Sequence, residues 1–214
     1  TNKHHGEQYD SPAEKRVYYF EDQRSYHTLK TGWVHDGGHW YYLQKDGGFD
    51  SRINRLTVGE LARGWVKDFP LTYDEDKLKA APWYYLDPTT ATMQTGWQYL
   101  GNKWYYLRSS GAMATGWYQD GSTWYYLDAE NGDMKTGWAS INGYWYYLRS
   151  SGAMATGWLQ DGSTWYYLNA SNGDMKTGWF QVNGKWYYAY SSGALAVNTK
   201  VDGYYVNYNG EWVQ

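Results

Sequence analysis

A glycine-tryptophan pair recurs along the chain at almost constant spacing, and this repeat constrains the fold more than any other sequence feature. From Trp97 to Trp179 the successive intervals are 20, 21, 20 and 21 residues. A second Trp, which opens a Trp-Tyr-Tyr triplet, follows most of these after seven residues. Units of about 20 residues cannot bury an apolar face alone, so the repeat predicts a stack of similar units.

The sequence also has a second period, about twice as long as the first. Residues 108–127 and 149–168 are identical except for Tyr118 and Leu159, which is a duplication of 41 residues. The repeating element therefore contains two units.

Each unit is predicted to be one β-hairpin. The fourth and fifth positions after the first Trp are turn pairs, such as Asn142-Gly143 and Gly162-Ser163. Asn-Gly is typical of type I′ turns and Gly-X of type II′ turns. With such a turn, side-chain alternation puts both Trp and the second Tyr of a unit on one face. The first Tyr and the following Leu take the other face.

Composition agrees with a core of aromatic hairpins. The chain of 214 residues has 15 Trp and 26 Tyr but only 4 Phe, and its mean hydropathy is −0.84. A net charge of −3 gives no basic field for nucleic acid. Cysteine is absent, which excludes disulfides and thiolate metal sites. No apolar run of about 18 residues occurs, so we expect no membrane span.

The second unit departs from the pattern through an insertion at about 50–82. Thr72 and Glu75 have the spacing of a capping box, so a short helix is predicted to run to about Ala80 and stop at Pro82. The insertion is either a decorated loop or a docking surface for an upstream domain or for a host or bacterial protein.

The two ends predict separate segments. Val17-Tyr18-Tyr19-Phe20 resembles a degraded triplet, and residues 1–30 are interpreted as a degenerate repeat or a linker from an upstream module. Residues 31–196 form the repeat solenoid. Residues 197–214 lack both Trp positions of a regular unit and are predicted to form a capping hairpin.

The shared face indicates cation binding. Trp and Tyr rings around a small gap attract a cation through the negative ring face, with roughly 0.5–2 kcal/mol per contact. A quaternary ammonium fits because its charge is spread over methyl groups. Modest single sites would be strengthened by multivalency on a polymer.

Other chemistry has weak support. His35 and His39 flank a turn and could share a metal, but solvated loop histidines are the preferred interpretation. Asp74, Glu75 and Asp76 suit the start of a helix. We find no nucleophile–base pair and no phosphate loop, so no catalytic residue and no cofactor is expected.

The pattern Thr-Gly-Trp-x4-Gly/Asn-x-x-Trp-Tyr-Tyr-Leu-x3-Gly-x-Met resembles the choline-binding repeats of Gram-positive surface proteins and phage lysins. The resemblance covers roughly residues 31–196. It implies an all-β solenoid of stacked β-hairpins that binds phosphocholine on teichoic or lipoteichoic acid. It also implies cages between consecutive units, each with two Trp from one hairpin, a Tyr from the next and an apolar side chain.

Carried over by position, the resemblance implies four regular cages and three weaker ones. The regular cages are Trp97, Trp104, Tyr126 and Met113; Trp117, Trp124, Tyr147 and Met134; Trp138, Trp145, Tyr167 and Met154; and Trp158, Trp165, Tyr188 and Met175. The weaker ones are Trp65, Trp83, Tyr106 and Met93; Trp33 and Trp40 with Phe49; and Trp179 and Trp186 with Leu195.

Three functions remain open at this point. The first is a choline-binding anchor, secreted and held non-covalently at the cell wall. The second is a glucan-binding repeat domain, because aromatic rings also stack on sugars. The third is an enzyme, either in this chain or, if the chain is the targeting module of a larger hydrolase or esterase, in an upstream module.

Overall fold

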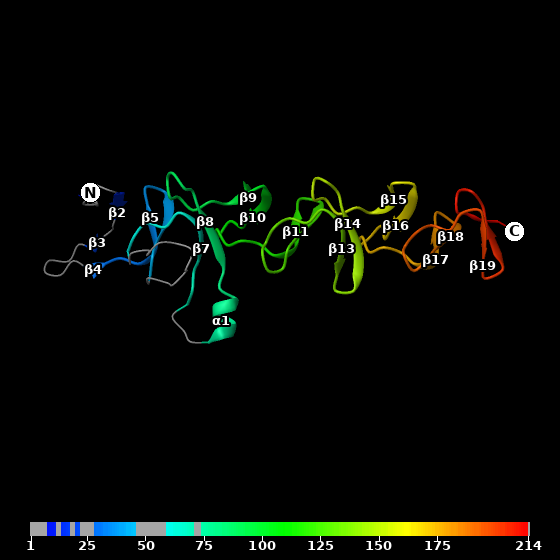
Figure 1. Cartoon of the computed structure of the whole chain (residues 1–214), viewed down its shortest axis with the longest axis horizontal. Coiled ribbons are helices and arrows are strands. Elements are labelled where there is room, and N and C mark those ends of the chain that lie inside the picture. Colours follow the sequence, from blue (N-terminus) through cyan, green and yellow to red (C-terminus); the bar gives the residue numbers. More distant parts are fainter. Residues whose placement is uncertain are drawn as a thin grey trace. The chain divides into compact units, whose positions relative to one another are not determined.

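The computed structural model describes residues 8–11, 14–17, 20–21, 28–45, 59–70 and 74–213. The chain divides into two compact units, residues 1–114 and 115–214, which are described separately. The expected solenoid of residues 31–196 includes parts of both. Figure 1 shows the elements in chain order, strands with a single helix among the described residues.

Consecutive strands pair into short antiparallel sheets, most of them two-stranded, and this confirms the all-β class. The first unit contains β1 (Gln8–Ser11), β2 (Glu14–Val17), β3 (Phe20–Glu21), β4 (Thr28–Leu29), β5 (Gly32–Asp36), β6 (His39–Leu43), β7 (Gly64–Lys67), α1 (Glu75–Lys79), β8 (Trp83–Leu86), β9 (Gly96–Leu100) and β10 (Lys103–Leu107). The second contains β11 (Gly116–Asp120), β12 (Thr123–Leu127), β13 (Gly137–Ile141), β14 (Tyr144–Leu148), β15 (Gly157–Asp161), β16 (Thr164–Leu168), β17 (Gly178–Val182), β18 (Lys185–Ala189), β19 (Thr199–Val201), β20 (Tyr204–Val206) and β21 (Trp212–Val213).

The predicted hairpin register is confirmed. In β11–β12, Trp117 pairs with Tyr126 and Gln119 pairs with Trp124. The turns follow their residues, because Asn142 and Gly143 both have positive φ, of 51° and 84°, as a type I′ turn requires. Gly101-Asn102 differs from the Gly-X expectation, since Asn102 also has a positive φ of 64°.

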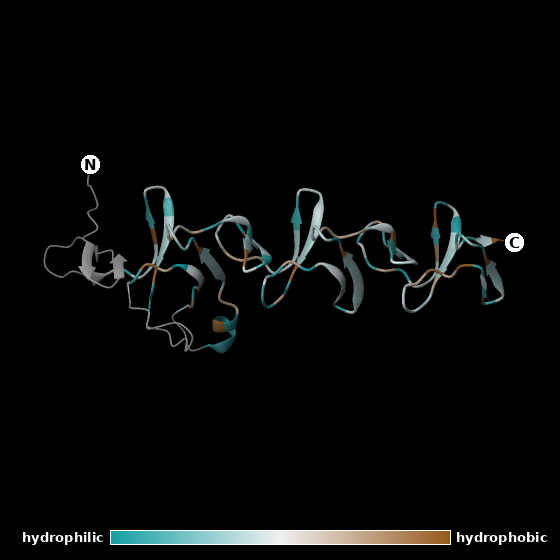
Figure 2. Cartoon of the chain, turned by 45° about the horizontal axis from the view of Figure 1, so that its top comes forward, coloured by the Kyte–Doolittle hydropathy of each residue, from teal (hydrophilic) through white to brown (hydrophobic). Residues whose placement is uncertain are grey.

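The core of most hairpins centres on the leucine that ends the second strand, whereas β18 ends in the buried Ala189 and β20 in the buried Val206. Leu127, Leu148 and Leu168 are fully buried. Trp and Tyr are amphipathic and have intermediate hydropathy, so most strand ribbon in Figure 2 is pale rather than brown. These leucines are the largest fully buried side chains of their repeats, with smaller contributions from residues such as Ile141 and Leu159.

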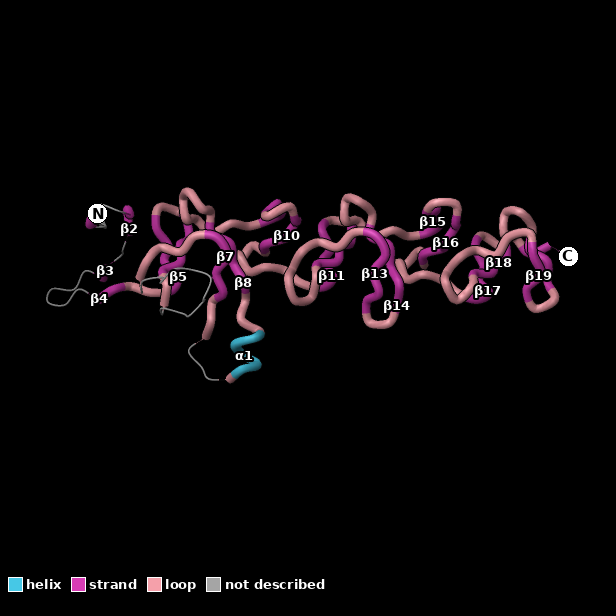
Figure 3. The backbone as a smooth tube through the Cα atoms, in the orientation of Figure 1, coloured by secondary structure: helices cyan, strands magenta, loops and turns pink. Residues whose placement is uncertain are grey.

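The segment that leads from one hairpin to the next, here called the return, is drawn as a loop in Figure 3. Its backbone forms hydrogen bonds with neighbouring hairpins. In the return after β14, Met154 N–H donates to the Trp124 carbonyl of the preceding hairpin at 2.8 Å. Ala155 N–H donates to the Tyr147 carbonyl of its own hairpin at 2.8 Å. This return therefore links two successive hairpins. Such links stabilise the hairpins, because two-stranded sheets alone are marginal in water.

The inserted helix is shorter than the sequence predicted. α1 has five residues and is capped by Asp74, whose carboxylate accepts from the backbone N–H groups of Asp76 and Lys77. The prediction of a capping box beginning at Thr72 concerns a residue outside the described part. Asp74 is a preferred N-cap residue, and with Glu75 it places negative charge at the helix start.

The C-terminal cap has one strand more than the predicted hairpin. β20 pairs with β19 and also with β21, so Trp212 completes a three-stranded sheet. Lys185 Nζ lies 2.6 Å from Glu211 of this cap. At the other end, Val17 closes β2 and Phe20 begins β3, and the predicted degraded triplet between them is only partly within the described residues.

An ion pair fixes the return after β12. Asp128 accepts from Lys135 Nζ at 2.8 Å and from the backbone N–H groups of Asn131 and Glu130 at 2.9 and 3.0 Å. The hydrogen bond from Lys135, followed by the two backbone bonds, lowers the pKa of Asp128 from 3.8 to about 2. The folded state therefore favours the charged carboxylate.

We expect this carboxylate to stabilise the fold above about pH 4 and to lose its contribution as pH falls through about 2. Asp128→Asn should cost about 1 kcal/mol at pH 6, because the pair is partly exposed, and almost nothing at pH 2. The equivalent position one duplication later is Asn169, so Asn169→Asp should show the opposite change. Denaturant unfolding at both pH values measures this, and a pH-independent difference would contradict it.

Candidate aromatic binding sites

Each regular hairpin has two tryptophans of different exposure. The inner Trp, which follows Gly, is half-buried, whereas the outer Trp, which opens the triplet, is exposed by 39% in Trp124. The ring centroids of Trp117 and Trp124 lie 6.4 Å apart with an interplanar angle of 84°. For Trp158 and Trp165 the values are 6.5 Å and 83°. Two perpendicular indoles form a corner with one exposed wall, which a small cation can enter.

The second Tyr of each triplet contacts the inner Trp of its own hairpin. The centroids of Trp117 and Tyr126 lie 5.1 Å apart, and those of Trp138 and Tyr147 lie 5.2 Å apart. Both contacts are edge-to-face, which is the favoured aromatic geometry. This follows from the register, since these residues are cross-strand partners.

The first Tyr of the next hairpin provides the contact between hairpins. Trp117 lies 4.8 Å from Tyr146, Trp138 lies 4.7 Å from Tyr166, and Trp158 lies 4.8 Å from Tyr187, measured between ring centroids. In the first unit the same contact joins Trp33 to Tyr84 at 4.6 Å and Trp65 to Tyr105 at 4.9 Å. Every one of these is an edge-to-face arrangement.

The ring contacts between hairpins favour the other Tyr of the triplet, and which Tyr lines a binding site stays a prediction. The sequence assigned the second Tyr of the next hairpin to each cage. Ring contacts are described for four of these residues, Tyr106, Tyr147, Tyr167 and Tyr188. The ring contacts place each of these in its own hairpin. Because side chains alternate along a strand, the second Tyr faces the following hairpin and the first Tyr faces the preceding one.

The apolar side chain also comes from one repeat later than expected. Met175 packs with Trp138, Tyr147 and Tyr166 against the buried cluster that contains Leu168. The sequence assigned Met154 to this site, but the Met154 amide bonds to Trp124 in the preceding hairpin. Similarly, Met113 N–H bonds to the Trp83 carbonyl, Met175 N–H to that of Trp145 and Leu195 N–H to that of Trp165. A return thus lies beside the hairpin before its own.

The first site is better formed than the sequence indicated. Trp33, Tyr84 and Met93 pack against the buried Tyr42 and Leu86, so the displaced second hairpin does meet the first. Met93 N–H donates to the carbonyl of Trp40, so Met93 lies at the first hairpin, whereas the sequence grouped it with Trp65. Phe49, the residue predicted for this site, lies outside the described part of the chain.

The last site receives rings from the cap. Trp179 lies 5.9 Å from Tyr204, which lies 5.9 Å from Trp212. Leu195, which was predicted for this site with Trp179 and Trp186, packs instead in the cluster with Trp158 and Tyr167. The Tyr204-Tyr205 pair after the Asp202-Gly203 turn was the available signal for a substitute ring.

The predicted group of Trp97, Trp104, Tyr126 and Met113 draws residues from both units. Within the first unit, Trp97 and Trp104 form the same perpendicular corner, at 6.5 Å and 82°. Because the units are described separately, the complete group stays a prediction.

Carboxylates bond to some inner tryptophans. Trp33 Nε1 donates to Asp68 at 3.0 Å, and Lys45 Nζ and Tyr42 OH donate to the other oxygen at 2.6 and 3.0 Å. Burial alone would raise the pKa of Asp68, but these bonds outweigh it and lower the pKa. Burial, together with the charge of Asp68, raises the pKa of Tyr42 well above its usual value. Tyr42 therefore stays a neutral donor.

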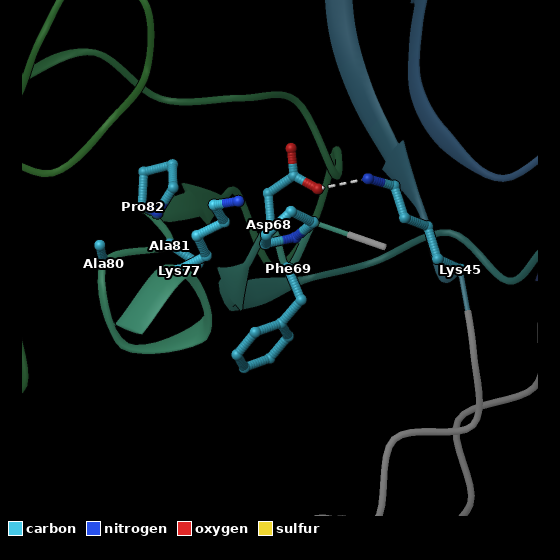
Figure 4. A pocket seen from close by; sticks show the side chains of 8 residues that line it. Lys45, Asp68, Phe69, Lys77, Ala80, Ala81 and Pro82 are labelled. Atoms are coloured by element: carbon cyan, nitrogen blue, oxygen red, sulfur yellow. Dashed lines mark hydrogen bonds and ion pairs between the residues drawn. The ribbon is translucent and has the colours of Figure 1, made fainter. Parts of the chain in front are cut away.

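A cavity of about 340 Å³ lies beside this carboxylate. Figure 4 shows Lys45 reaching toward Asp68, with Phe69, Lys77 of α1 and the C-cap residue Ala80 around the space. The decorated-loop and docking-surface interpretations of the insertion both stay predictions, because its residues 50–58 and 71–73 lie outside the described part.

Two further expectations concern the described residues. No three potential metal ligands among them lie together, and His35 lies against Trp40 with centroids 4.9 Å apart. Within the same residues, no helix is long and apolar enough to span a membrane.

Family models agree with the repeat. A choline-binding repeat matches residues 94–136 and 135–178, and a cell wall binding repeat matches residues 31–49 and 177–195. Together these segments cover more than half of the chain, and this chain belongs to the choline-binding repeat family. Modules of this family are generally non-catalytic binding domains. A search of curated proteins finds no match.

Solved structures place the chain near three proteins of Streptococcus pneumoniae. CbpJ is 68% identical with a TM-score of 0.78, over 92% of this chain and 62% of its own. Choline-binding protein F is 63% identical with a TM-score of 0.82, over 97% of this chain and 64% of its own. The choline-binding domain of CbpL is 34% identical with a TM-score of 0.52, over 86% of this chain and 98% of its own. The chain thus spans less than two thirds of the CbpJ and choline-binding protein F chains.

Proposed function

We propose that this chain is a non-catalytic module that binds choline and holds a surface protein on the phosphocholine of teichoic and lipoteichoic acids. The observation that carries the proposal is the group of inner Trp, outer Trp and the first Tyr of the next hairpin, whose ring contacts are complete at Trp117 and at Trp158. In the hairpin 116–127 these are Trp117, Trp124 and Tyr146, with one ring exposed to solvent.

The chemistry of the group favours a quaternary ammonium over a sugar. Its side chains are aromatic rings and, at Trp138, the partly buried Met175, and ring faces attract a methylated cation. A glucan subsite would need several polar side chains aimed at hydroxyl groups. Where an inner Trp does bond to a carboxylate, as Trp138 does to Asp161, the indole N–H is already occupied.

Weak single sites suffice if the ligand is a polymer. Each cation–π contact contributes roughly 0.5–2 kcal/mol, so one site is expected to have modest affinity. Consecutive hairpins repeat the site every 20 or 21 residues, and a chain with many phosphocholine groups can engage several at once. Attachment at the cell wall is then strong, non-covalent and reversible.

We expect the chain to bind a tertiary-amine resin and to be eluted by free choline, with saturable heat in a calorimetric titration. The melting temperature should climb progressively with choline, because a ligand of the native state adds stability by mass action. Equimolar sodium chloride is the control and should elute less, since the contact is mainly between ring faces and methyl groups, which salt screens little. Retention at high choline with a flat melting temperature would reject the proposal, and stabilisation by a soluble glucan instead would favour carbohydrate binding.

A further inference from the structure

The residue that faces the inner Trp from the next element is a carboxylate at some sites. Trp138 Nε1 donates to Asp161 Oδ2 at 2.9 Å, and Asp161 ends the first strand of the next hairpin. Trp179 Nε1 donates in the same way to Asp202, in the turn of the cap, at 3.0 Å. Both carboxylates are exposed to solvent.

At the sites between these, the corresponding residue is aliphatic. The hairpin that faces Trp117 has Ile141 where the next one has Asp161, and the hairpin that faces Trp158 has Val182. Ile141 is buried, and Val182 packs against the same cluster as Trp158. These side chains cannot accept a hydrogen bond from an indole.

The alternation follows the duplication of 41 residues. A strand that ends in Asp161 is followed by the turn Gly162-Ser163, whereas strands that end in Ile141 or Val182 are followed by Asn-Gly turns. In the second unit the inner tryptophans at 117, 138, 158 and 179 therefore face an aliphatic residue, a carboxylate, an aliphatic residue and a carboxylate.

We propose that the binding sites of this chain are of two alternating kinds, anionic and neutral, and that the anionic sites at Trp138 and Trp179 bind choline more tightly. This inference rests on the proposed function and adds Asp161 and Asp202 to it as determinants of affinity. A neutral site selects the ligand by ring faces and methyl contacts alone, whereas an anionic site adds a charge opposite to that of the ligand.

Charge and geometry both support the difference. A cation over an indole lies within about 6 Å of the ring centroid, and Asp161 Oδ2 lies 2.9 Å from a ring atom of the same indole. The two charges are therefore closer than the screening length of about 8 Å in physiological salt. The carboxylate also polarises the N–H bond, which makes the ring face more negative. At Trp33, by contrast, Lys45 lies 2.6 Å from Asp68 and offsets the charge.

The test resolves single sites in the full chain by following indole N–H signals in a ¹⁵N-edited NMR titration with choline chloride. Conservative Trp138→Phe and Trp158→Phe variants assign the two signals. In the wild type the Trp138 signal should saturate at lower choline than the Trp158 signal. Asp161→Asn keeps an oxygen acceptor but removes the charge, and should raise the Kd at Trp138 about three- to tenfold, as expected for unit charges about 7 Å apart near a solvated surface.

Two controls separate charge from structure. The first repeats the titration with 3,3-dimethyl-1-butanol, a neutral isostere of choline, whose affinity at Trp138 should not change in Asp161→Asn. The second compares Val182→Asp with Val182→Asn, where only the Asp variant should tighten choline binding at Trp158. Glu130→Gln removes an exposed loop charge and should leave both sites unchanged.

The outcomes are distinguishable. An unchanged choline Kd at Trp138 in Asp161→Asn overturns the inference while the wild-type titration still supports choline binding. An equal loss for choline and for the neutral isostere also overturns it, because the carboxylate would then only hold the ring in place. If no indole signal of the wild type responds to choline, the proposed function itself fails.

Discussion

Gly152→Ala is expected to lower the free energy of unfolding by about 2–5 kcal/mol, whereas Gly143→Ala should lower it by only about 1–2 kcal/mol. Both glycines have a φ of +84°, so both variants place a side chain in the left-handed region, at about 1–2 kcal/mol. A Cβ at Gly152 would also overlap Met134 Sδ and lie 2.9 Å from its Cγ, whereas at Gly143 it meets open space. Overpacking of this kind costs a further 1–3 kcal/mol or so.

Denaturant unfolding of the two variants measures the difference. Adding Met134→Ala to Gly152→Ala should restore part of the lost stability, because the colliding side chain is removed, and the same addition to Gly143→Ala should only destabilise it. Equal losses for the two glycine variants would show that the methionine moves aside at no cost.

Trp124→Ala should remove one choline site from a folded chain, because its ring is 39% exposed and lines the site from outside. Tyr146→Ala should damage the same site, since Tyr146 contacts Trp117, the other Trp of that hairpin. The double variant Trp124→Ala/Tyr146→Ala is therefore expected to lose one site in total, a strongly non-additive result. Trp124→Ala/Tyr147→Ala should lose two, because Tyr147 contacts Trp138 of the next site.

Calorimetric stoichiometry of free choline distinguishes the two double variants. Tyr144→Ala is the matched control, since Tyr144 is 60% exposed at a hairpin tip. Each variant is first checked for a cooperative melt, because removing a large ring that packs on its neighbours can itself destabilise the fold. Identical stoichiometries in the two double variants would contradict the assignment of the first Tyr to the preceding hairpin.

The hairpins could be predicted from the sequence because every determinant is local. The pairs Asn142-Gly143 and Gly162-Ser163 specify two-residue turns, and the turn fixes the register that pairs Trp117 with Tyr126. The same register predicts that both Trp and the second Tyr share a face, which the contact of Trp117 with both Trp124 and Tyr126 confirms.

The composition of each site was harder to predict because it depends on how one hairpin lies against the next. Alternation shows that Tyr146 and Tyr147 point to opposite faces, but not which face meets the preceding hairpin. The return adds a second uncertainty. Met154 is next to its own hairpin in sequence, yet its N–H bonds to Trp124 in the hairpin before. Long-range register of this kind has no local signature.

The carboxylates were missed for a related reason. Asp161 and Ile141 both end a strand beside a turn, where polar and apolar residues are equally acceptable to the hairpin itself. Their difference acts on the tryptophan of the preceding repeat, as the bond from Trp138 to Asp161 shows. A comparison of successive turns against the 41-residue period would have revealed that Asp and aliphatic residues alternate. It would not have revealed that the Asp side chain bonds to a Trp of the preceding hairpin.

The 41-residue period has a consequence for how such a chain can change length. Deleting residues 137–177 would join Thr136 to Gly178 and bring Val182 to the place that Ile141 occupies beside Trp117. One aliphatic residue would then replace another. Deleting only residues 157–177 would bring Val182 to Trp138 in place of Asp161. An in-frame recombination that removes or adds two hairpins therefore preserves the order of neighbours, whereas one that removes a single hairpin creates a mismatched junction. Copy number in this architecture is expected to vary in steps of two.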